Sequence, residues 1–191
     1  MSYLTLEAER AVLLFADLQA GIVERTVTQE LDRLRRAVFA LAKLARLCAM
    51  PAIVTAAPPA SGAVQLIPEI ATALGELPHY LRTTTDAFTH GATRDAIAGT
   101  RRPILLISGV ATEIIVQHTA LSAVASGLQA QVVVDACGGL SQRTENAAFQ
   151  RLAMAGVEMT CVASIAGQLA GDVTQERGSK VLGVLYEMAS P

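Results

Sequence analysis

Short, continuously apolar runs alternate with segments of helical periodicity along most of the chain. An uninterrupted apolar run of four to eight residues is typical of a strand that is buried on both faces. The runs lie at 11–16, 52–55, 104–108, 131–134 and 157–162, with a shorter extended piece at 80–82. These six segments are predicted to be strands.

The segments between the runs show helical spacing. From Leu31 to Cys48, apolar residues recur at steps of three and four, with arginine and lysine residues between them. That pattern predicts an amphipathic helix, which Pro51 prevents from continuing. Two more helices are predicted, one after Thr112 that ends at Gly127 and one at about 144–155 that ends before Gly156.

This alternation predicts an α/β fold. Short uncharged strands separated by helices form a mostly parallel, doubly wound central sheet with helices on both faces, a three-layer αβα sandwich. No linker-like or low-complexity segment divides the 191 residues, so residues 1–191 are expected to form a single domain. Sheets of this type place their functional residues beyond the carboxyl ends of the strands.

Composition narrows the classes of partner. Hydrophobic residues make up 52% and charged residues 17% of the chain, and the net charge is −2. Nucleic-acid binding is therefore not expected, because no basic field exists, and the apolar excess favours burial between copies in a homo-oligomer. The uncharged segment from Ile114 to Val134 is 21 residues long, but its polar residues and Gly127 favour a buried helix, a turn and a strand over a membrane span. Three unpaired cysteines and an N-terminus without a signal-like pattern favour the cytoplasm.

Charged and polar residues follow several of the predicted strands. Asp17 ends an all-apolar strand, where a carboxylate is unfavourable unless it is paired or hydrogen-bonded, so it is either a helix cap or a functional acid. Gln19 lies two residues further on, and Arg82 ends the short extended piece. Asp135 is interpreted as a turn former before Gly138.

Four segments are informative in combination: AVLLFADLQAG at 11–21, LRTTTDAF at 81–88, SGVATEIIVQHTA at 108–120 and VVVDACG at 132–138. They resemble the isochorismatase-like hydrolase superfamily, also called the cysteine hydrolases, and the likeness extends from about Ala11 to Gly167. The third segment resembles the family's nucleophile region, in which a strand ends in Gly-Val, followed by a small residue, threonine and an acid.

The resemblance assigns site residues. The family's catalytic aspartate matches Asp17, its lysine falls at Arg82 and its nucleophilic cysteine falls at Ile115. It also implies a pocket near Gln19, Phe88, Val110, Ala111 and Thr112, and a cis peptide between Val110 and Ala111. Thr112 is, in addition, expected to be a helix N-cap, because threonine is a favoured residue type there. No cofactor is expected, and no metal, because His79, His90 and His118 lack the spacing of metal ligands.

Three functional hypotheses remain open. The first is a hydrolase that acts on a small carboxylate-bearing molecule without a thiol: Asp17 donates a proton, as in the family's true isochorismatases, which cleave a vinyl ether, and Arg82 holds the substrate carboxylate. The second is a catalytically inactive member that serves as a binding or oligomeric structural protein. The third is a hydrolase that uses Cys137 or an activated water. Whether Cys137 or His118 reaches the pocket is left open, because buried cysteines and lone helical histidines are more often core or interface residues.

Overall fold

The computed structural model describes residues 6–189 and contains a six-stranded sheet whose strands are all parallel, in the order β3-β2-β1-β4-β5-β6. The strands are β1 (Ala11–Ala16), β2 (Ala52–Ala56), β3 (His79–Leu81), β4 (Ile104–Val110), β5 (Gln129–Gly138) and β6 (Glu158–Thr160). The predicted α/β fold with a doubly wound sheet is confirmed, and the sheet is wholly rather than mostly parallel.

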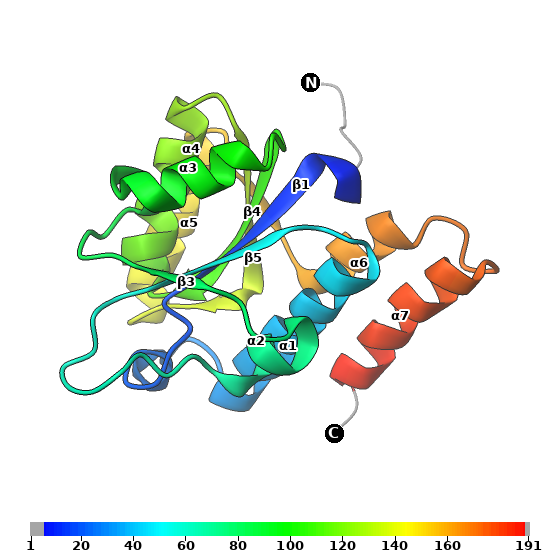
Figure 1. Cartoon of the computed structure of the whole chain (residues 1–191), viewed down its shortest axis with the longest axis horizontal. Coiled ribbons are helices and arrows are strands. Elements are labelled where there is room, and N and C mark those ends of the chain that lie inside the picture. Colours follow the sequence, from blue (N-terminus) through cyan, green and yellow to red (C-terminus); the bar gives the residue numbers. More distant parts are fainter. Residues whose placement is uncertain (1–5, 190–191) are drawn as a thin grey trace.

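Helices cover both faces of this sheet (Figure 1). One layer holds α1 (Leu31–Leu47), α2 (Pro68–Leu74), α6 (Val162–Ala170) and α7 (Glu176–Ala189), and the other holds α3 (Gly91–Gly99), α4 (Gln117–Ala125) and α5 (Gln142–Met154). Short turns of 3-10 helix occur at Ala8–Arg10, Val23–Arg25 and Ala87–Thr89, and a π-helical turn at Thr112–Val116 precedes α4. The apolar stretch at 181–186 lies in α7, which packs against α1 and α6 through Val181 and Val184.

The central strand β1 shows why the apolar runs predict buried strands. All six of its residues are buried. Successive side chains of a strand face opposite sides of the sheet, so Leu13 and Phe15 join the core beneath α1 while Val12 and Leu14 join the core beneath α4. A strand with a helical layer on each side has no solvent face that would favour a polar residue.

The predicted boundaries of the last two strands are wrong. β5 continues to Gly138, so Asp135 lies inside a strand rather than in a turn, and its carboxylate accepts hydrogen bonds from the Val162 N–H at 3.0 and 3.2 Å. β6 ends at Thr160, and Cys161 is the N-cap of α6 rather than a strand residue. The carboxylate of Asp135 satisfies an amide at the start of α6, which favours ending the strand there.

Thr112 is not a helix N-cap. It is the first residue of the π-helical turn, for which Ala111 is the N-cap, and its hydroxyl donates to the buried Glu145 carboxylate at 2.7 Å. The left-handed backbone at Gly127 and Gly156, each with φ +85°, ends α4 and α5 close to where the sequence predicts.

The strand order reverses between β1 and β4, because the chain moves from β1 toward β3 and then returns to the other side of β1. Ligands of open α/β sheets bind beyond the carboxyl ends of strands at such a switch point. The peptide between Val110 and Ala111, directly after β4, is cis, as the family resemblance implies. Within residues 6–189, no helix is long and apolar enough to cross a membrane.

Replacing Gly109 with alanine is expected to destabilise the fold by about 1–3 kcal/mol. Gly109 of β4 lies opposite Ala16 of β1, and a Cβ atom there would come within 2.4 Å of the Ala16 carbonyl oxygen. Gly183→Ala is the matched control, because a Cβ at this position in α7 meets nothing within 4 Å, and it is expected to stabilise by about 0.5–1 kcal/mol. Urea unfolding measures both, and equal effects of the two substitutions would contradict the close approach of β1 and β4.

Candidate functional site

Asp17 and Arg82 form a buried ion pair at the carboxyl edge of the sheet. Arg82 Nη2 donates to Asp17 Oδ2. Asp17 is 7% exposed and Arg82 is 3% exposed. The structure therefore brings together the two residues that the sequence predicts to be catalytic, in direct contact with each other rather than across an open space.

Strand β2 positions this pair. The Asp17 N–H donates to the Thr55 carbonyl and the Arg82 N–H donates to the Ala56 carbonyl, each at 3.0 Å. Asp17 has a φ of 56°, in the left-handed region that aspartate, asparagine and glycine tolerate best. The chain thus leaves β1 with a turn at Asp17, and neighbouring carbonyls of β2 hold both partners.

Three buried polar atoms near these strand ends have no hydrogen-bond partner among the residues that the structure describes. They are Asp17 Oδ1, Arg82 Nε and Thr55 Oγ1. Buried polar groups are nearly always hydrogen-bonded, so unpaired ones need an explanation such as a ligand or a water molecule. The unpaired acceptor on Asp17 and the unpaired donor on Arg82 match a group that both donates and accepts hydrogen bonds.

Burial raises the pKa of Asp17 above its ordinary value of 3.8, and the charge and hydrogen bond of Arg82 offset only part of this effect. Desolvation penalises the ionised form of a carboxyl group. A raised pKa suits a proton donor, because the carboxyl group keeps its proton to a higher pH.

The guanidinium of Arg82 makes two hydrogen bonds within the chain. Nη1 donates to the Thr84 carbonyl, Nη2 donates to Asp17, and Nε has no acceptor among the described residues. A bidentate clamp on a substrate carboxylate needs two parallel N–H groups of the guanidinium. In this geometry Arg82 orients Asp17, and each Nη group already has one acceptor within the chain.

Gln19 is also fixed in place. Its side-chain amide donates to the Ala57 carbonyl and accepts from the Ala57 N–H, both at 2.9 Å, and it is 1% exposed. With Asp17 and Arg82, it completes a set of contacts from the β1 and β3 ends to residues 55–57, at the end of β2.

Ile115 and Phe88 belong to one apolar cluster beneath α3, α4 and α5, with exposures of 1% and 8%. Phe88 is held by its N–H bond to the Asp86 carboxylate at 2.8 Å, and the Ala87 N–H donates to Thr119 Oγ1 at 3.0 Å. Val110 and Ala111 are buried in the cluster on the opposite face.

The other reactive residues lie apart from the pair. Burial strongly raises the pKa of the Cys137 thiol, which disfavours a thiolate there. His118 is exposed on α4, and its Nδ1 contacts the Ile114 carbonyl at 2.7 Å. Among the described residues, no three histidine, cysteine or acidic side chains are grouped so that they could hold a metal ion.

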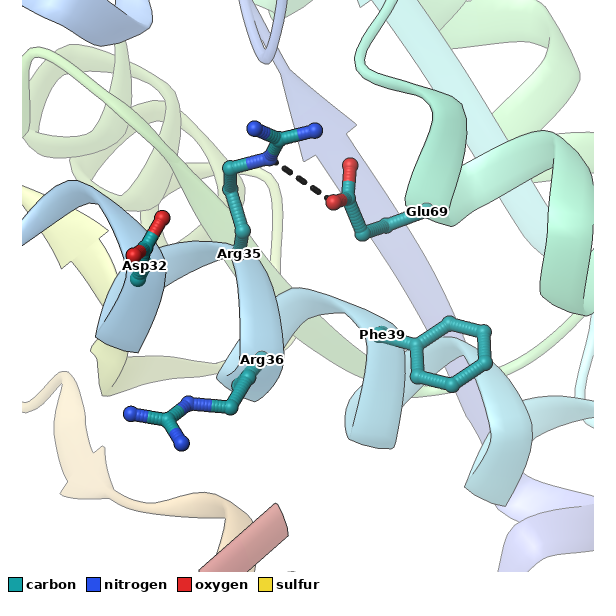
Figure 2. A pocket seen from close by; sticks show the side chains of 5 residues that line it. All are labelled: Asp32, Arg35, Arg36, Phe39 and Glu69. Carbon is teal, nitrogen blue, oxygen red and sulfur yellow. Dashed lines mark hydrogen bonds and ion pairs between the residues drawn. The ribbon is translucent and has the colours of Figure 1, made fainter. Parts of the chain in front are cut away.

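Two cavities open near the start of α1 and near the β1 end. One, of about 700 Å³, lies on the outer surface of α1 and α2, where Arg35 Nε donates to Glu69 Oε1 at 2.7 Å while Arg36 extends away from that pair (Figure 2). The other, of about 610 Å³, is lined by Gln19, by Arg25 and by the loop after β2. Only the second contains a residue that the sequence predicts for the site. The sequence prediction does not include Arg25, although this residue lies in the loop after β1, where the strand-end rule expects functional residues.

Comparison with known proteins assigns this chain to a family. The family model described as Isochorismatase domain matches residues 11–164. The probable hydrolase YcaC of Escherichia coli K12 is 30% identical over 171 residues, which are 89% of this chain and 82% of that protein.

Two solved structures are similar over nearly their whole length. The YcaC gene product from E. coli, described as an octameric hydrolase of unknown specificity, is 28% identical with a TM-score of 0.91, covering 98% of this chain and 92% of the other. YcaC from Pseudomonas aeruginosa, with hexane-2,5-diol and covalent acrylamide, has the same identity and TM-score and covers 99% and 96%. The match over residues 11–164, together with these relatives, shows that this chain belongs to the isochorismatase family.

Proposed function

We propose that the chain is an isochorismatase-family hydrolase that binds a small carboxylate-bearing molecule and uses Asp17 as its proton donor, without a cysteine nucleophile. The observation that carries this proposal is the buried Asp17–Arg82 pair at the carboxyl edge of the sheet, with the pKa of Asp17 raised by burial. Arg82 orients the carboxyl group.

A thiol mechanism is set aside because of Ile115, the position that the family resemblance equates with the nucleophilic cysteine. A hydrocarbon side chain has no lone pair with which to attack a carbonyl group. Cys137, the alternative thiol, is buried with a raised pKa. General acid catalysis by Asp17 needs neither thiol.

Vinyl-ether hydrolysis fits these groups. The protonated Asp17 carboxyl group transfers its proton to the vinyl carbon, and water then attacks the resulting oxocarbenium carbon. Loss of a proton from this water gives a hemiketal, which collapses to a ketone and an alcohol. Asp17 recovers its proton from solvent, so the residue is unchanged after each turnover.

The test is release of pyruvate from an enolpyruvyl ether of the isochorismate type, measured with lactate dehydrogenase and NADH. Wild-type protein is expected to release pyruvate, and Asp17→Asn is expected to lose at least about a hundredfold in rate. Asp135→Asn is the matched control, because burial also raises the pKa of Asp135 but its carboxylate contacts the start of α6. No pyruvate from the wild type, or equal losses in both variants, would contradict the proposal, and the former would leave a binding or structural role.

We propose in addition that the protein is a homo-oligomer. The E. coli relative is octameric. Large apolar side chains are exposed here at several places, at Val27, Leu81, Leu140, Met154 and Val173. Light scattering during size-exclusion chromatography measures the mass, and a monomer would contradict this part of the proposal.

A further inference from the structure

The cavity of about 610 Å³ lies between two loops at the carboxyl edge of the sheet. The first, the β1 loop, covers residues 17–25, and the second, the β2 loop, covers residues 57–66. Backbone hydrogen bonds join the loops: the Ala20 N–H donates to the Gln65 carbonyl at 2.8 Å, and Gln19 pairs with Leu66 in an isolated bridge. Both rims of the cavity are therefore fixed to the residues that directly follow Asp17.

Arg25 is the charged residue of the cavity lining, which contains no aspartate or glutamate. Its side chain is exposed, and its Nε donates to the Gly21 carbonyl at 2.9 Å, which leaves the Nη groups unused. No carboxylate of the described chain forms an ion pair with it, and the neighbouring Glu24 instead accepts from the Gly21 N–H at 2.7 Å. The charge of Arg25 is thus available to a ligand.

The β2 loop carries further amide groups at two exposed residues of the cavity lining. The N–H groups of Ser61 and Gly62 have no acceptor within residues 6–189. Pro58 and Pro59 precede them and restrict the backbone of the loop. A lining with one cation, unpaired amide donors and no acid is complementary to an anion.

Gln19 connects this cavity to the turn that carries Asp17. Gln19 lines the cavity, and its N–H donates to the Asp17 carbonyl at 2.9 Å. Its side chain bonds to Ala57, where the β2 loop begins. A ligand held here lies against the residue that joins the loop to the Asp17 turn.

We propose that this cavity binds the carboxylate of a small organic acid, with Arg25 as the charged contact and the Ser61 and Gly62 amides as additional donors. The inference rests on the proposed function, because only that function makes the bound acid a substrate. It assigns the binding of the carboxylate to Arg25 instead of Arg82. Two observations carry it: the Nη groups of the exposed Arg25 have no acceptor among the described residues, whereas Arg82 is 3% exposed and each of its Nη groups already has one acceptor.

The test is titration of ¹⁵N-labelled protein with two probes of equal size, succinamate, which has one carboxylate, and succinamide, which is neutral. Succinamate is expected to shift the amide signals of Gly21, Ser61 and Gly62 and to bind at least about tenfold more tightly than succinamide. Arg25→Gln is expected to remove this preference, and Arg25→Lys to restore part of it. Arg151→Gln, at an exposed position in the last turn of α5, is the control and is expected to bind as the wild type does.

Equal binding of the two probes, signal shifts away from the cavity, or equal behaviour of Arg25→Gln and Arg151→Gln would overturn the anion site. Asp17→Asn separates this outcome from failure of the proposed function. Succinamate binding that persists in Asp17→Asn, together with a failed pyruvate assay, supports the anion site and contradicts only the proton-donor role. Pyruvate release that is unaffected by Arg25→Gln contradicts only the anion site.

Discussion

Replacing Asp17 with asparagine is expected to lower the free energy of unfolding by about 3–5 kcal/mol at pH 7. The guanidinium of Arg82, 3% exposed, then remains buried without a counter-charge. An arginine cannot lose its proton to relieve this penalty. Asparagine tolerates the left-handed backbone of residue 17, at φ 56°, so the loss reports the charge rather than backbone strain. Urea unfolding followed by circular dichroism measures the difference.

The opposite substitution, Arg82→Met, is expected to depend on pH in a way that Asp17→Asn does not. Asp17 becomes a buried carboxyl without a partner, and its pKa, already raised from 3.8, rises further. The folded state then holds the proton more tightly than the unfolded state does, so stability increases as the pH falls from above the folded pKa toward 3.8. Arg82→Met therefore gains stability as the pH falls through this range, whereas Asp17→Asn has no carboxyl group at residue 17 and its Arg82 stays charged.

Two further variants are controls for this asymmetry. Asp17→Asn combined with Arg82→Met removes both charges and is expected to be more stable than the sum of the single losses indicates. Lys43→Met breaks the ion pair of Lys43 with Glu187, whose side chain is 61% exposed, and is expected to lose at most about 1 kcal/mol. The buried charged pair would be contradicted if Asp17→Asn and Arg82→Met both lost less stability than Lys43→Met does. It would also be contradicted if the stabilities of these two variants depended on pH in the same way.

The sequence predicts the strands well because their apolar character has one physical cause. β1, β4 and the middle of β5 lie between two helical layers, so nearly every position selects a hydrocarbon side chain. The same reasoning predicts α1, whose buried residues fall on one face. When one face of an element is buried, its apolar residues recur at a regular spacing in the sequence.

The predictions fail where a distant contact decides the local structure. Aspartate is a residue type that is common in turns, but the carboxylate of Asp135 accepts a hydrogen bond from the Val162 N–H. This contact favours the end of β6 before Cys161. The helices α2, α3 and α6 have seven to nine residues, so their periodicity is weak. Length does not explain why α7, with 14 residues, is absent from the prediction. Contacts between residues 27 positions apart have no signature in local pattern.

The candidate site shows the same division. The strand-end rule and the family resemblance locate Asp17, Arg82 and Ile115 in the chain, but neither predicts that the Nη groups of Arg82 bind Asp17 and the Thr84 carbonyl. Those contacts depend on where β3 lies beside β2, which is a property of the folded sheet. These contacts are the reason why we propose that Arg82 orients Asp17.

Ile115→Cys is expected to introduce a reactive thiol at the position that the family resemblance equates with the nucleophile. Residue 115 is as buried as Cys137, but it lies in the π-helical turn that follows β4, where the dipole of a helix N-terminus favours a thiolate. We expect acrylamide to alkylate residue 115 at least about tenfold faster than Cys137, whose pKa burial raises strongly. Peptide mass spectrometry at successive times measures the two rates in one sample.

Ile115→Val is the matched control, because it also removes buried hydrocarbon but adds no thiol. Ile115 is 1% exposed, and the valine variant is expected to lose about 0.5–1.5 kcal/mol of stability. It reports whether opening space in this cluster makes Cys137 reactive by itself. If the thiol that Ile115→Cys introduces reacts no faster than Cys137, the proposed equivalence of Ile115 to the catalytic cysteine is wrong, and Ile115 is a core residue only.

The combination of Ile115→Cys with Asp17→Asn distinguishes activation from exposure. If Asp17 takes the proton of the new thiol, asparagine at residue 17 is expected to slow alkylation of residue 115 severalfold. If the thiol reacts only because it is accessible, the rate is unchanged. Asp17→Asn also weakens the fold, but unfolding would expose Cys137 and Cys48 together with residue 115. Slower alkylation at residue 115 with no faster alkylation of Cys137 is therefore the result that assigns the proton transfer to Asp17.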